Sequence, residues 1–400
     1  MVQRDSYISR EIERALQQAL ARGKSVFLLG PRQTGKTTLI SHIPTDESIS
    51  LIQPGVRQHY ERNPSVFCSE VEALAEKVKK KPVVAVDEVQ LVPELMDVVQ
   101  DLIDRHVAQF ILTGSSARKL RRAAHVNFLP GRVINFKLSP LSLAELTSLP
   151  SIHELLHYGS LPGIMREEDV FSREVDLTSY VSTYLEEEIR AEAVVRNLGA
   201  FGRFLELAAS ESGNMISMRK LSEEIGVSHS TISSYYQILE DCLIIERVDA
   251  LVKSKVGRNL MKSPKYLFYD LGIRRLSARE GVGLPEKHLR QLFEQFIGLE
   301  LIRYCQQRMI HSKVYYWRDR SGPEIDWILE REGQYIPIEV KWTTMPKEKD
   351  ARHLQLFLKE YENSEVGYIV CRVPLPCKIA EKIYAIPWQH LADIDELLKK

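Results

Sequence analysis

The segment KSVFLLGPRQTGKTTLIS, residues 24–41, constrains the fold of this chain more than any other segment. Its apolar run at 24–30 is typical of a buried parallel strand and ends in a glycine. The next residues, GPRQTGKT, fit the pattern G-x-x-x-x-G-K-[ST], and a helical stretch follows. A strand, a glycine-containing loop and a helix in this order form a phosphate-binding loop, the Walker A motif. We therefore expect an α/β fold whose amino-terminal part is a P-loop NTPase core with a parallel sheet.

Each part of this loop has an expected role. Gly30 and Gly35 allow the backbone to turn so that successive N–H groups point into one concavity. Lys36 should reach the β- and γ-phosphates of a nucleotide, and the Thr37 hydroxyl should ligate Mg²⁺. For Arg32, an orientation toward an anion and one toward solvent both remain open. The residues expected to bind ATP are Gly30, Pro31, Arg32, Gln33, Thr34, Gly35, Lys36, Thr37 and Thr38.

A second buried strand, KPVVAV at 81–86, ends in the acidic pair Asp87 and Glu88. An aspartate at the end of such a strand can hold the Mg²⁺ shell, as in a Walker B motif. Glu88 is then placed to polarise the water that attacks the γ-phosphate. The alternative is an acidic pair that caps the next helix. The presence of a Walker A motif upstream favours the catalytic interpretation.

Two further segments are candidates for contacts near the γ-phosphate. QFILTGSSARKL, residues 109–120, is typical of a strand that ends in polar residues. There Thr113 or Ser115 is either a phosphate sensor or an ordinary strand-end residue. Arg132 is a candidate for the arginine that stabilises the transition state, in its own subunit or in a neighbouring one. A surface arginine at a turn remains the alternative.

Taken together, GPRQTGKTTL, VDEVQ, LTGSS, LPGR and LSPLSLAEL resemble the AAA+-related P-loop ATP-binding proteins of bacteria and archaea. Those proteins carry a C-terminal domain of unknown function. The resemblance implies an ATPase domain, which we expect to span residues 1–165. A guanine-recognition motif of the N/TKxD type does not follow LTGSS, which favours ATP over GTP.

Residues 166–255 are expected to form a helical and winged-helix region. Within SMRKLSEEIGVSHSTISSYYQILEDCLIIERV at 217–248, Gly226 ends one helix and Ser228 or Ser230 caps the next, as in a helix-turn-helix. The second helix has no Lys or Arg from 228 to 241, which disfavours DNA contact through it and leaves a lid as the alternative. A basic segment follows, and we expect a β-wing or a loop that contacts a phosphate backbone, or else an exposed loop that only aids solubility. Its basic residues are Lys253, Lys255, Arg258, Lys262 and Lys265.

The last predicted domain, residues 256–400, contains an amphipathic helix at 286–307 and then three strands. Asp326 lies on the second strand, and Glu339 and Lys341 form an E-x-K on the third. This part resembles the PD-(D/E)xK nuclease superfamily, with Pro323 and Asp326 at a wider spacing. The resemblance implies Mg²⁺ held by Asp326 and Glu339 and a water oriented or activated by Lys341. A helix glutamate, Glu294 or Glu300, should complete the site; an exposed hairpin with ordinary charge pairs is the alternative.

Composition limits the remaining possibilities. Lys plus Arg and Asp plus Glu both total 54, so any nucleic-acid surface must be a local patch. The five cysteines include no CxxC pair, which argues against a disulfide framework or a zinc site. No apolar segment resembles a signal peptide or a membrane span. We expect a cytoplasmic, Mg²⁺-dependent ATPase for nucleic-acid processing or sensing, with DNA as candidate partner, a homo-oligomer as candidate assembly and no membrane contact. The alternative is an ATP-switched regulatory protein whose nuclease-like domain only docks a partner.

Overall fold

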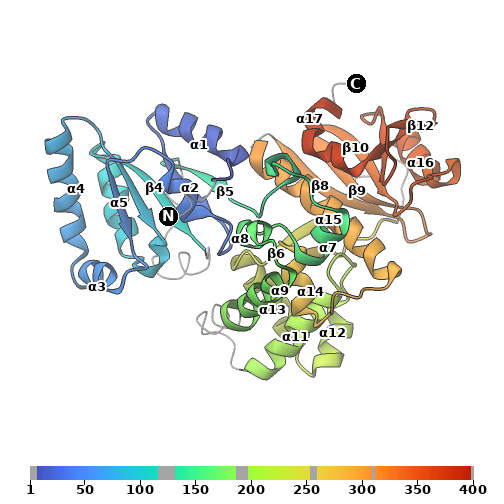
Figure 1. The fold of residues 1–400 in the computed structure, drawn as a ribbon, viewed down its shortest axis with the longest axis horizontal. Helices are drawn as coiled ribbons and strands as arrows, with labels where there is room; N and C mark the ends of the chain where they lie inside the picture. Colours follow the sequence, from blue (N-terminus) through green and yellow to red (C-terminus); the bar gives the residue numbers. More distant parts are fainter. Residues whose placement is uncertain (1–6, 116–130, 186–196, 253–258, 309–310, 398–400) are drawn as a thin grey trace. The chain divides into compact units, whose positions relative to one another are not determined.

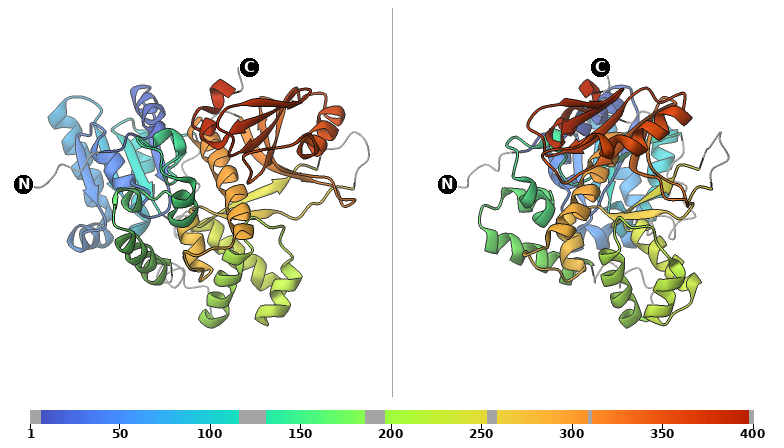
Figure 2. Two further views of the ribbon diagram at one scale, coloured as in Figure 1. Left: turned by 45° about the vertical axis from the view of Figure 1, so that its right-hand side comes forward. Right: turned by 90° about the vertical axis from the view of Figure 1, so that its right-hand side faces the viewer.

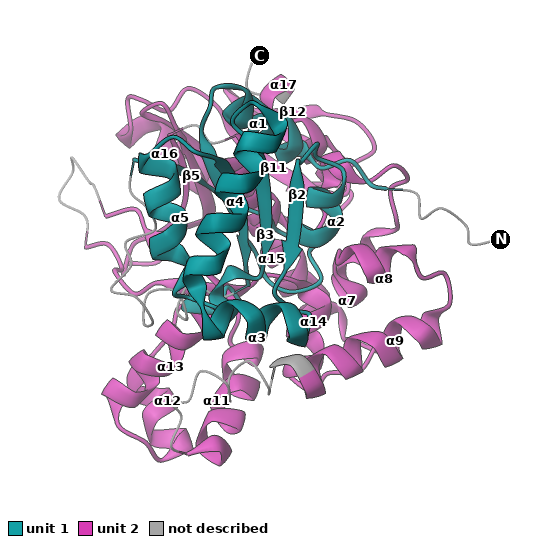
Figure 3. Ribbon diagram, turned by 90° about the vertical axis from the view of Figure 1, so that its left-hand side faces the viewer, with its two compact units in different colours: residues 1–140, 241–244 teal, residues 141–240, 245–400 magenta. Residues whose placement is uncertain are grey.

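The computed structural model describes residues 7–115, 131–185, 197–252, 259–308 and 311–397 (Figure 1). The chain divides into two compact units (Figure 3). The first consists of residues 1–140 with 241–244, and the second of residues 141–240 with 245–400. In the part of the chain that is described, no helix is both long and apolar enough to cross a lipid bilayer.

The first unit contains a five-stranded parallel sheet in the order β2-β3-β4-β1-β5. Its strands are β1 (Ser25–Leu29), β2 (Glu47–Ser50), β3 (Val83–Asp87), β4 (Gln109–Gly114) and β5 (Val133–Lys137). Its helices are α1 (Glu11–Ala21), α2 (Lys36–Ser41), α3 (Pro54–Arg62), α4 (Pro64–Val78) and α5 (Leu95–Asp104), with a short 3-10 turn at Val89–Leu91. The predicted α/β fold with a parallel P-loop core is confirmed.

Helices cover both faces of this sheet (Figure 1). Apolar residues of α3, α4 and α5, such as Tyr60, Phe67 and Leu102, form one buried layer with β3 and β4. On the other face, α1 and α2 pack against β1 and β5 through residues that include Leu16 and Leu39. Because both faces are covered, the central strands β1, β3 and β4 are buried almost throughout rather than alternating, whereas the edge strands β2 and β5 keep polar, partly exposed residues. The carboxyl ends of β1, β3 and β4 therefore remain the open edge at which polar groups can meet.

The second unit begins with short helices and the helical region predicted for the middle of the chain. They are a 3-10 turn (Leu143–Glu145), α7 (Ile152–Tyr158), α8 (Pro162–Arg166), α9 (Val170–Ser179), a π-helical segment (Tyr180–Leu185), α11 (Leu198–Ser210), α12 (Met218–Ile225) and α13 (His229–Asp241). Gly226 ends α12 with a φ of 80°, and Ser228 accepts the backbone N–H of Thr231 at the start of α13. The predicted helix boundaries and the cap by Ser228 are thus confirmed.

The mixed sheet of the second unit has eight strands in the order β12-β13-β11-β10-β9-β8-β6-β7. The strands are β6 (Ile245–Ala250), β7 (Lys265–Phe268), β8 (Ser312–Arg318), β9 (Glu324–Arg331), β10 (Gln334–Val340), β11 (Gly367–Cys371), β12 (Cys377–Ala380) and β13 (Ile383–Pro387). The remaining helices are α14 (Leu271–Ser277), α15 (Glu286–Arg308), α16 (Arg352–Glu360) and α17 (Ile394–Leu397), with 3-10 turns at Glu348–Ala351 and Trp388–Asp393.

Two helices sandwich the centre of this sheet (Figure 2). The long helix α15 packs on the face that carries Trp327, Ile338 and Val340. Helix α16 packs on the opposite face, against residues that include Ile328 and Ile369. Ile336, Ile338 and Val340 alternate along β10 and share the face that packs against α15. In chain order this core is α15, β8, β9, β10, α16 and β11, with β8 to β10 antiparallel and β10 parallel to β11.

The two compact units differ from the three predicted domains, 1–165, 166–255 and 256–400. Strand β6 lies between β7 and β8 in the sheet; it pairs antiparallel with β7 and parallel with β8. Because β6 is shared, the helical middle region and the C-terminal sheet form one unit. The predicted first boundary also falls later than the structural one, since residues from Leu141 onward pack in the second unit.

Candidate functional site

The loop between β1 and α2 has the backbone of an anion-binding turn. Gly35 has a φ of 92° and Gln33 a φ of 61°, both in the left-handed region that lets successive amides face one side. A Cβ on Gly30 would lie 2.4 Å from the carbonyl oxygen of Leu138, so this position requires glycine. The Thr34 hydroxyl donates to the Pro31 carbonyl at 2.8 Å and closes the turn. The loop is therefore fixed by its own contacts.

Lys36 points into this loop and is buried. Its Nζ donates to the carbonyls of Gly30 at 2.9 Å and Pro31 at 3.1 Å, and it lies 3.4 Å from Glu88 Oε1. Burial lowers the pKa of Lys36, while the nearby Glu88 opposes that effect. Burial alone would raise the pKa of Glu88, but the charge of Lys36 and hydrogen bonds from Ser115 and Gln90 hold it below its usual range. The two groups form a buried ion pair.

The carboxylates at the end of β3 contact residues at the ends of two other segments. The Thr37 hydroxyl donates to Asp87 Oδ2 at 2.8 Å. On the neighbouring strand β4, the Thr113 hydroxyl donates to Asp87 Oδ1 at 2.5 Å and accepts the backbone N–H of Glu88 at 2.9 Å. Ser115 donates to Glu88 Oε2 at 2.9 Å. Walker A, the acidic pair and the end of β4 thus converge at one edge of the sheet.

Glu88 itself has a φ of 57°, which is uncommon for a residue other than glycine. Such backbone conformations persist where surrounding contacts hold them, and they occur often at functional sites. Here the side chains of Ser115 and Gln90 hold the Glu88 carboxylate, and the Thr113 hydroxyl holds its N–H. This clamp aims the carboxylate at Lys36.

Two supporting residues were not singled out from the sequence. Arg10, which is 5% exposed, donates to the Thr34 carbonyl and to the Ser139 carbonyl, both at 2.7 Å. Gln90 donates to Glu88 and, at 3.1 Å, to Ser115. Neither residue belongs to the glycine loop in sequence. Gln90 could have been found because it belongs to the VDEVQ segment, whereas no motif includes Arg10.

The other predicted loop residues are distributed as follows. Arg32, Gln33, Thr37 and Thr38 are exposed, whereas Pro31, Thr34 and Lys36 are buried. The charge of the exposed Arg32 makes a small contribution to lowering the pKa values of both Lys36 and Glu88.

Arg132 lies far from this edge of the sheet. It directly precedes β5, whose first residue Val133 is in register with Ser25 at the amino end of β1. The Walker residues follow the carboxyl ends of the strands, at the opposite edge. Arg132 instead forms an exposed ion pair with Asp104, with contacts of 2.6 and 2.9 Å. The structure does not bring Arg132 to the phosphate loop of its own chain, and an action in a neighbouring subunit stays a prediction.

A second group of functional candidates lies in the C-terminal sheet. The register that pairs Trp327 with Ile338 places Asp326 and Glu339 side by side at the end of β9 and β10. Together with Glu294 and Lys341 they line one pocket. Lys341 donates to Glu339 Oε1 at 2.5 Å, and Asp326 Oδ2 accepts the backbone N–H of Val340 at 2.8 Å. We call this the carboxylate pocket: Glu294, Asp326, Glu339 and Lys341.

The electrostatics of the carboxylate pocket are those of a crowded acidic site. Burial, Glu339 and Glu294 raise the pKa of Asp326 well above its usual range. Burial also raises the pKa of Glu339, although Lys341 opposes this. Burial alone would lower the pKa of Lys341, but Glu339 and Asp326 raise it above its usual value, so the side chain is an ammonium ion. Glu339 Oε2 is buried and has no hydrogen-bond partner.

The two glutamates proposed to complete this site have different environments. Glu294 lines the pocket. Glu300 accepts from Arg303 at 2.6 Å and from the backbone N–H of Leu143 at 2.8 Å, in a buried ion pair outside the pocket. Among the described residues, no group of three His, Cys, Asp or Glu side chains is arranged closely enough to hold a metal ion. The candidate metal ligands are therefore the pair Asp326 and Glu339.

The basic segment after β6 is only partly described. Lys253, Lys255 and Arg258 lie outside the described residues, and Lys262 is exposed. Of the interpretations open for this segment, the exposed solubilising loop does not hold for Lys265. This lysine begins β7, where it pairs with Val248, and its Nζ donates to Glu294 Oε1 at 2.9 Å. Strand pairing turns the side chain inward.

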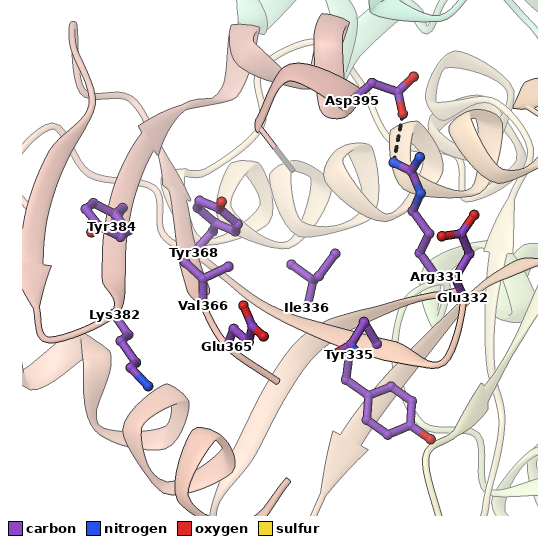
Figure 4. A pocket seen from close by; sticks show the side chains of 11 residues that line it. Arg331, Glu332, Tyr335, Ile336, Glu365, Val366, Tyr368, Lys382, Tyr384 and Asp395 are labelled. Atoms are coloured by element: carbon purple, nitrogen blue, oxygen red, sulfur yellow. Dashed lines mark hydrogen bonds and ion pairs between the residues drawn. The ribbon is translucent and has the colours of Figure 1, made fainter. Parts of the chain in front are cut away.

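Another pocket lies at the opposite end of β10 and its neighbours (Figure 4). Its lining includes Ile336, Tyr368 and Tyr384, each near the first residue of its strand. Arg331 in this pocket forms an ion pair with Asp395 at 2.8 Å. None of the predicted site residues lines it, so we do not assign chemistry to it.

Family models match three consecutive parts of the chain. Residues 22–147 match a model described as an AAA domain. The first unit carries an AAA-type ATPase domain. Residues 149–282 and 290–391 match two models that are each described as a domain of unknown function, DUF8612 and DUF4143. The ATPase domain contains all the predicted phosphate-loop and strand-end residues, and the carboxylate pocket falls in the last of the three matches.

Relatives of the whole chain carry no functional description. Two uncharacterised proteins, of Mycobacterium bovis and Mycobacterium tuberculosis, are each 25% identical over 402 residues, which is 97% of this chain and 86% of each relative. Among solved structures, the ORC2 protein of Aeropyrum pernix is 12% identical, covering 74% of this chain and 97% of that one, with a TM-score of 0.27. The Pif1 helicase of Candida albicans is 15% identical over 44% of each chain, with a TM-score of 0.24. Scores this low carry no argument about this chain.

Proposed function

We propose that this chain hydrolyses ATP with Mg²⁺ at the Lys36 site and that nucleotide state controls a metal-dependent phosphodiesterase in the second unit. The observation that carries the first part is the direct contact between Thr37 and Asp87 beside the ion pair of Lys36 and Glu88. A hydroxyl and a carboxylate in contact at a phosphate loop are the two ligand types that hold Mg²⁺ in P-loop enzymes.

In the proposed ATPase mechanism, the ammonium of Lys36 turns from Glu88 to the β- and γ-phosphates. Glu88 then loses the positive charge that lowers its pKa, while its burial still favours the protonated form. Its proton affinity rises at the moment when it must accept a proton from the attacking water. Ser115 and Gln90 keep the carboxylate oriented during this exchange. Bound Mg²⁺ would supply neutralisation of the phosphate charge.

The first test is ATP turnover by Lys36→Ala. This change removes the charge that contacts phosphate, and we expect loss of turnover to the level of a blank. Lys80→Ala is the matched control, because Lys80 is an exposed lysine of the same domain that pairs only with Asp46. Turnover by Lys36→Ala that equals wild type would remove the proposed ATP site.

We infer that the second unit contains a winged helix followed by a nuclease-like core. Support for the winged helix comes from α11, α12 and α13 followed by the antiparallel pair β6 and β7. Support for the nuclease-like core comes from the element order α15-β8-β9-β10-α16-β11, with the candidate residues at the ends of β9 and β10. This is the expected order of a PD-(D/E)xK core.

The residues of the carboxylate pocket fit a divalent cation. Glu339 Oε2 is a buried oxygen without a hydrogen-bond partner, and Asp326 is a half-buried carboxylate beside it. Mg²⁺ is commonly bound through one or two carboxylates, with waters and substrate phosphate completing its shell. Two carboxylates are therefore sufficient, although no third acidic ligand joins them among the described residues.

In the proposed cleavage, Asp326 and Glu339 would hold the ion, which when bound would supply an activated water. The oxygen of that water bonds to phosphorus while its proton passes to solvent, and the bond from phosphorus to the leaving oxygen breaks as that oxygen takes up a proton from solvent. Lys341 is an ammonium, so it orients the water or offsets the growing negative charge instead of accepting a proton. Arg290, Lys347 and Lys349 line the pocket beside the further carboxylates Glu324 and Asp350. The three cations offer contacts to a polyanionic substrate such as DNA.

The second test is cleavage of labelled DNA and RNA with Mg²⁺, with and without ATP. We expect cutting by wild type and none by Asp326→Ala or Lys341→Ala. Lys382→Ala, an exposed lysine in the pocket of Figure 4, is the control that should cut normally. If wild type cuts neither polymer, the phosphodiesterase assignment fails, and the chain is better described as an ATP-switched regulatory protein with a docking domain.

A further inference from the structure

Lys265 occupies an unusual position for a lysine. Its ammonium lies 2.9 Å from Glu294 Oε1, 4.8 Å from the ring centre of Trp327 and 5.3 Å from that of Tyr316. Only 12% of its side chain is exposed. It comes from β7, an edge strand outside the element order of the nuclease-like core. A strand outside the nuclease-like core thus places the positive charge of Lys265 next to the carboxylate pocket.

A buried lysine costs free energy unless carboxylates and ring faces compensate for its lost hydration. Here specific groups around the Lys265 ammonium compensate for its lost hydration. Glu294 gives the hydrogen bond, and Asp326 and Glu324 add attraction at longer range. The ring of Trp327 is fixed because its Nε1 donates to the Glu294 carbonyl at 3.0 Å. Lys265, Trp327 and helix α15 therefore hold one another around the Glu294 carboxylate.

The formal charges of the four residues of the carboxylate pocket and of Lys265 limit the number of metal ions that the pocket can hold. With carboxylates ionised, as metal binding requires, Glu294, Asp326 and Glu339 contribute three negative charges. Lys265 and Lys341 contribute two positive charges. One divalent ion would bring these five groups to a net charge of plus one, which suits a phosphodiester. Two divalent ions, as in two-metal nucleases, would leave these five groups with an excess of three positive charges in a partly buried site, whose outer lining adds both cations and carboxylates.

We propose that Lys265 is a positioning residue that replaces a second metal ion: it neutralises and holds Glu294, so that the pocket takes a single divalent cation on Asp326 and Glu339. This inference rests on the proposed metal-dependent function and specifies its stoichiometry. Lys265 does not touch the reacting phosphate but acts through Glu294 and through its charge.

The test counts Mn²⁺ bound to the nucleotide-free full chain, by the electron paramagnetic resonance signal of the free ion. The difference between wild type and Asp326→Asn gives the ions that belong to the pocket. We expect a difference of one. In Lys265→Met, which keeps the length and loses the charge, we expect a second ion or about tenfold tighter binding of the first, since one nearby unit charge is worth at least that factor. Lys265→Arg should restore the wild-type count and affinity.

Two controls make the result interpretable. Lys262→Met removes an exposed charge three residues away and should leave the count and affinity unchanged. If Lys265→Met does not fold, because Glu294 is left without its partner, the double variant Lys265→Met/Glu294→Gln removes both members of the pair. It should bind Mn²⁺ about tenfold more tightly than Glu294→Gln alone, because it has one positive charge fewer.

The outcomes separate this inference from the proposed function. Two Asp326-dependent ions in wild type, or an affinity and count that Lys265→Met leaves unchanged, overturn the role of Lys265 even if the chain cuts DNA. One ion without cleavage refutes the phosphodiesterase and leaves the role of Lys265 supported. A wild type that binds no Asp326-dependent ion overturns both.

Discussion

The ion pair between Lys36 and Glu88 makes a specific prediction about nucleotide affinity. A triphosphate must draw Lys36 away from Glu88, so the carboxylate competes with the phosphates for the same ammonium. Glu88→Gln keeps the shape of the side chain and removes this competitor. We therefore expect the variant to bind ATP more tightly than wild type while it hydrolyses ATP far more slowly.

The size of the effect follows from the separation of 3.4 Å between Nζ and Oε1. At an effective dielectric constant of about 20, two unit charges at this distance attract by about 5 kcal/mol. Desolvation offsets most of that attraction in a buried pair. The carbonyls of Gly30 and Pro31 also remain as partners of the ammonium. A net competition of about 1–2 kcal/mol remains, which corresponds to roughly 5–30-fold in the dissociation constant.

Isothermal titration with ATP and Mg²⁺ measures the affinity, and phosphate release measures turnover. We expect turnover to fall by about 10² or more, as for loss of a general base. Glu94→Gln is the matched control: it makes the same charge change at an exposed position six residues along the chain. An ATP affinity of Glu88→Gln that is equal to wild type or weaker would refute the competition. Unchanged turnover would exclude Glu88 as the base.

Two further predictions concern buried carboxylates of the second unit. Asp270 is fully buried and accepts the backbone N–H groups of Ser160, Gly272 and Ile273, so Asp270→Ala should lower the free energy of unfolding by about 3–5 kcal/mol in a urea titration; a loss under 1 kcal/mol would contradict this. Glu300→Gln should destabilise by a similar amount, because Arg303 would keep a buried charge without its carboxylate, and yet leave the Mn²⁺ count unchanged; a lost ion would show that Glu300 serves the pocket.

The geometry of the proposed ATP site was predictable because it follows from local patterns. Each of Lys36, Asp87 and Thr113 stands at or just after the carboxyl end of an apolar strand. In a parallel sheet these ends lie at one edge, so the residues converge without further information. Arg10 could not be found in this way. It reaches the loop carbonyl of Thr34 only because α1 packs on β1, and no local pattern announces that contact.

Gly159 shows the opposite limitation, because the residues around it in the sequence give no reason for the glycine. In the structure Gly159 has a φ of 70°, and a Cβ at this position would overlap the carboxylate of Asp270. The reason is a contact between residues more than a hundred positions apart. The position of Lys265 depends on a distant contact in the same way, because strand pairing buries it and its basic neighbours in the sequence do not indicate this.

The geometry of helix α15 explains why only one of the two candidate glutamates, Glu294 and Glu300, lines the carboxylate pocket. Glu294 and Glu300 are six residues apart, so at 3.6 residues per turn their side chains leave the helix about 240° apart. One of them can face the carboxylate pocket, and the other must face a different neighbour. Glu300 has Arg303 one turn later, and this pair holds the backbone of Leu143 and Leu141. Glu294 has no such partner on its own helix and takes Lys265 from β7. The helix therefore joins a structural ion pair and a pocket carboxylate in one rigid element, and a shift of α15 that disturbs the first must also move the second.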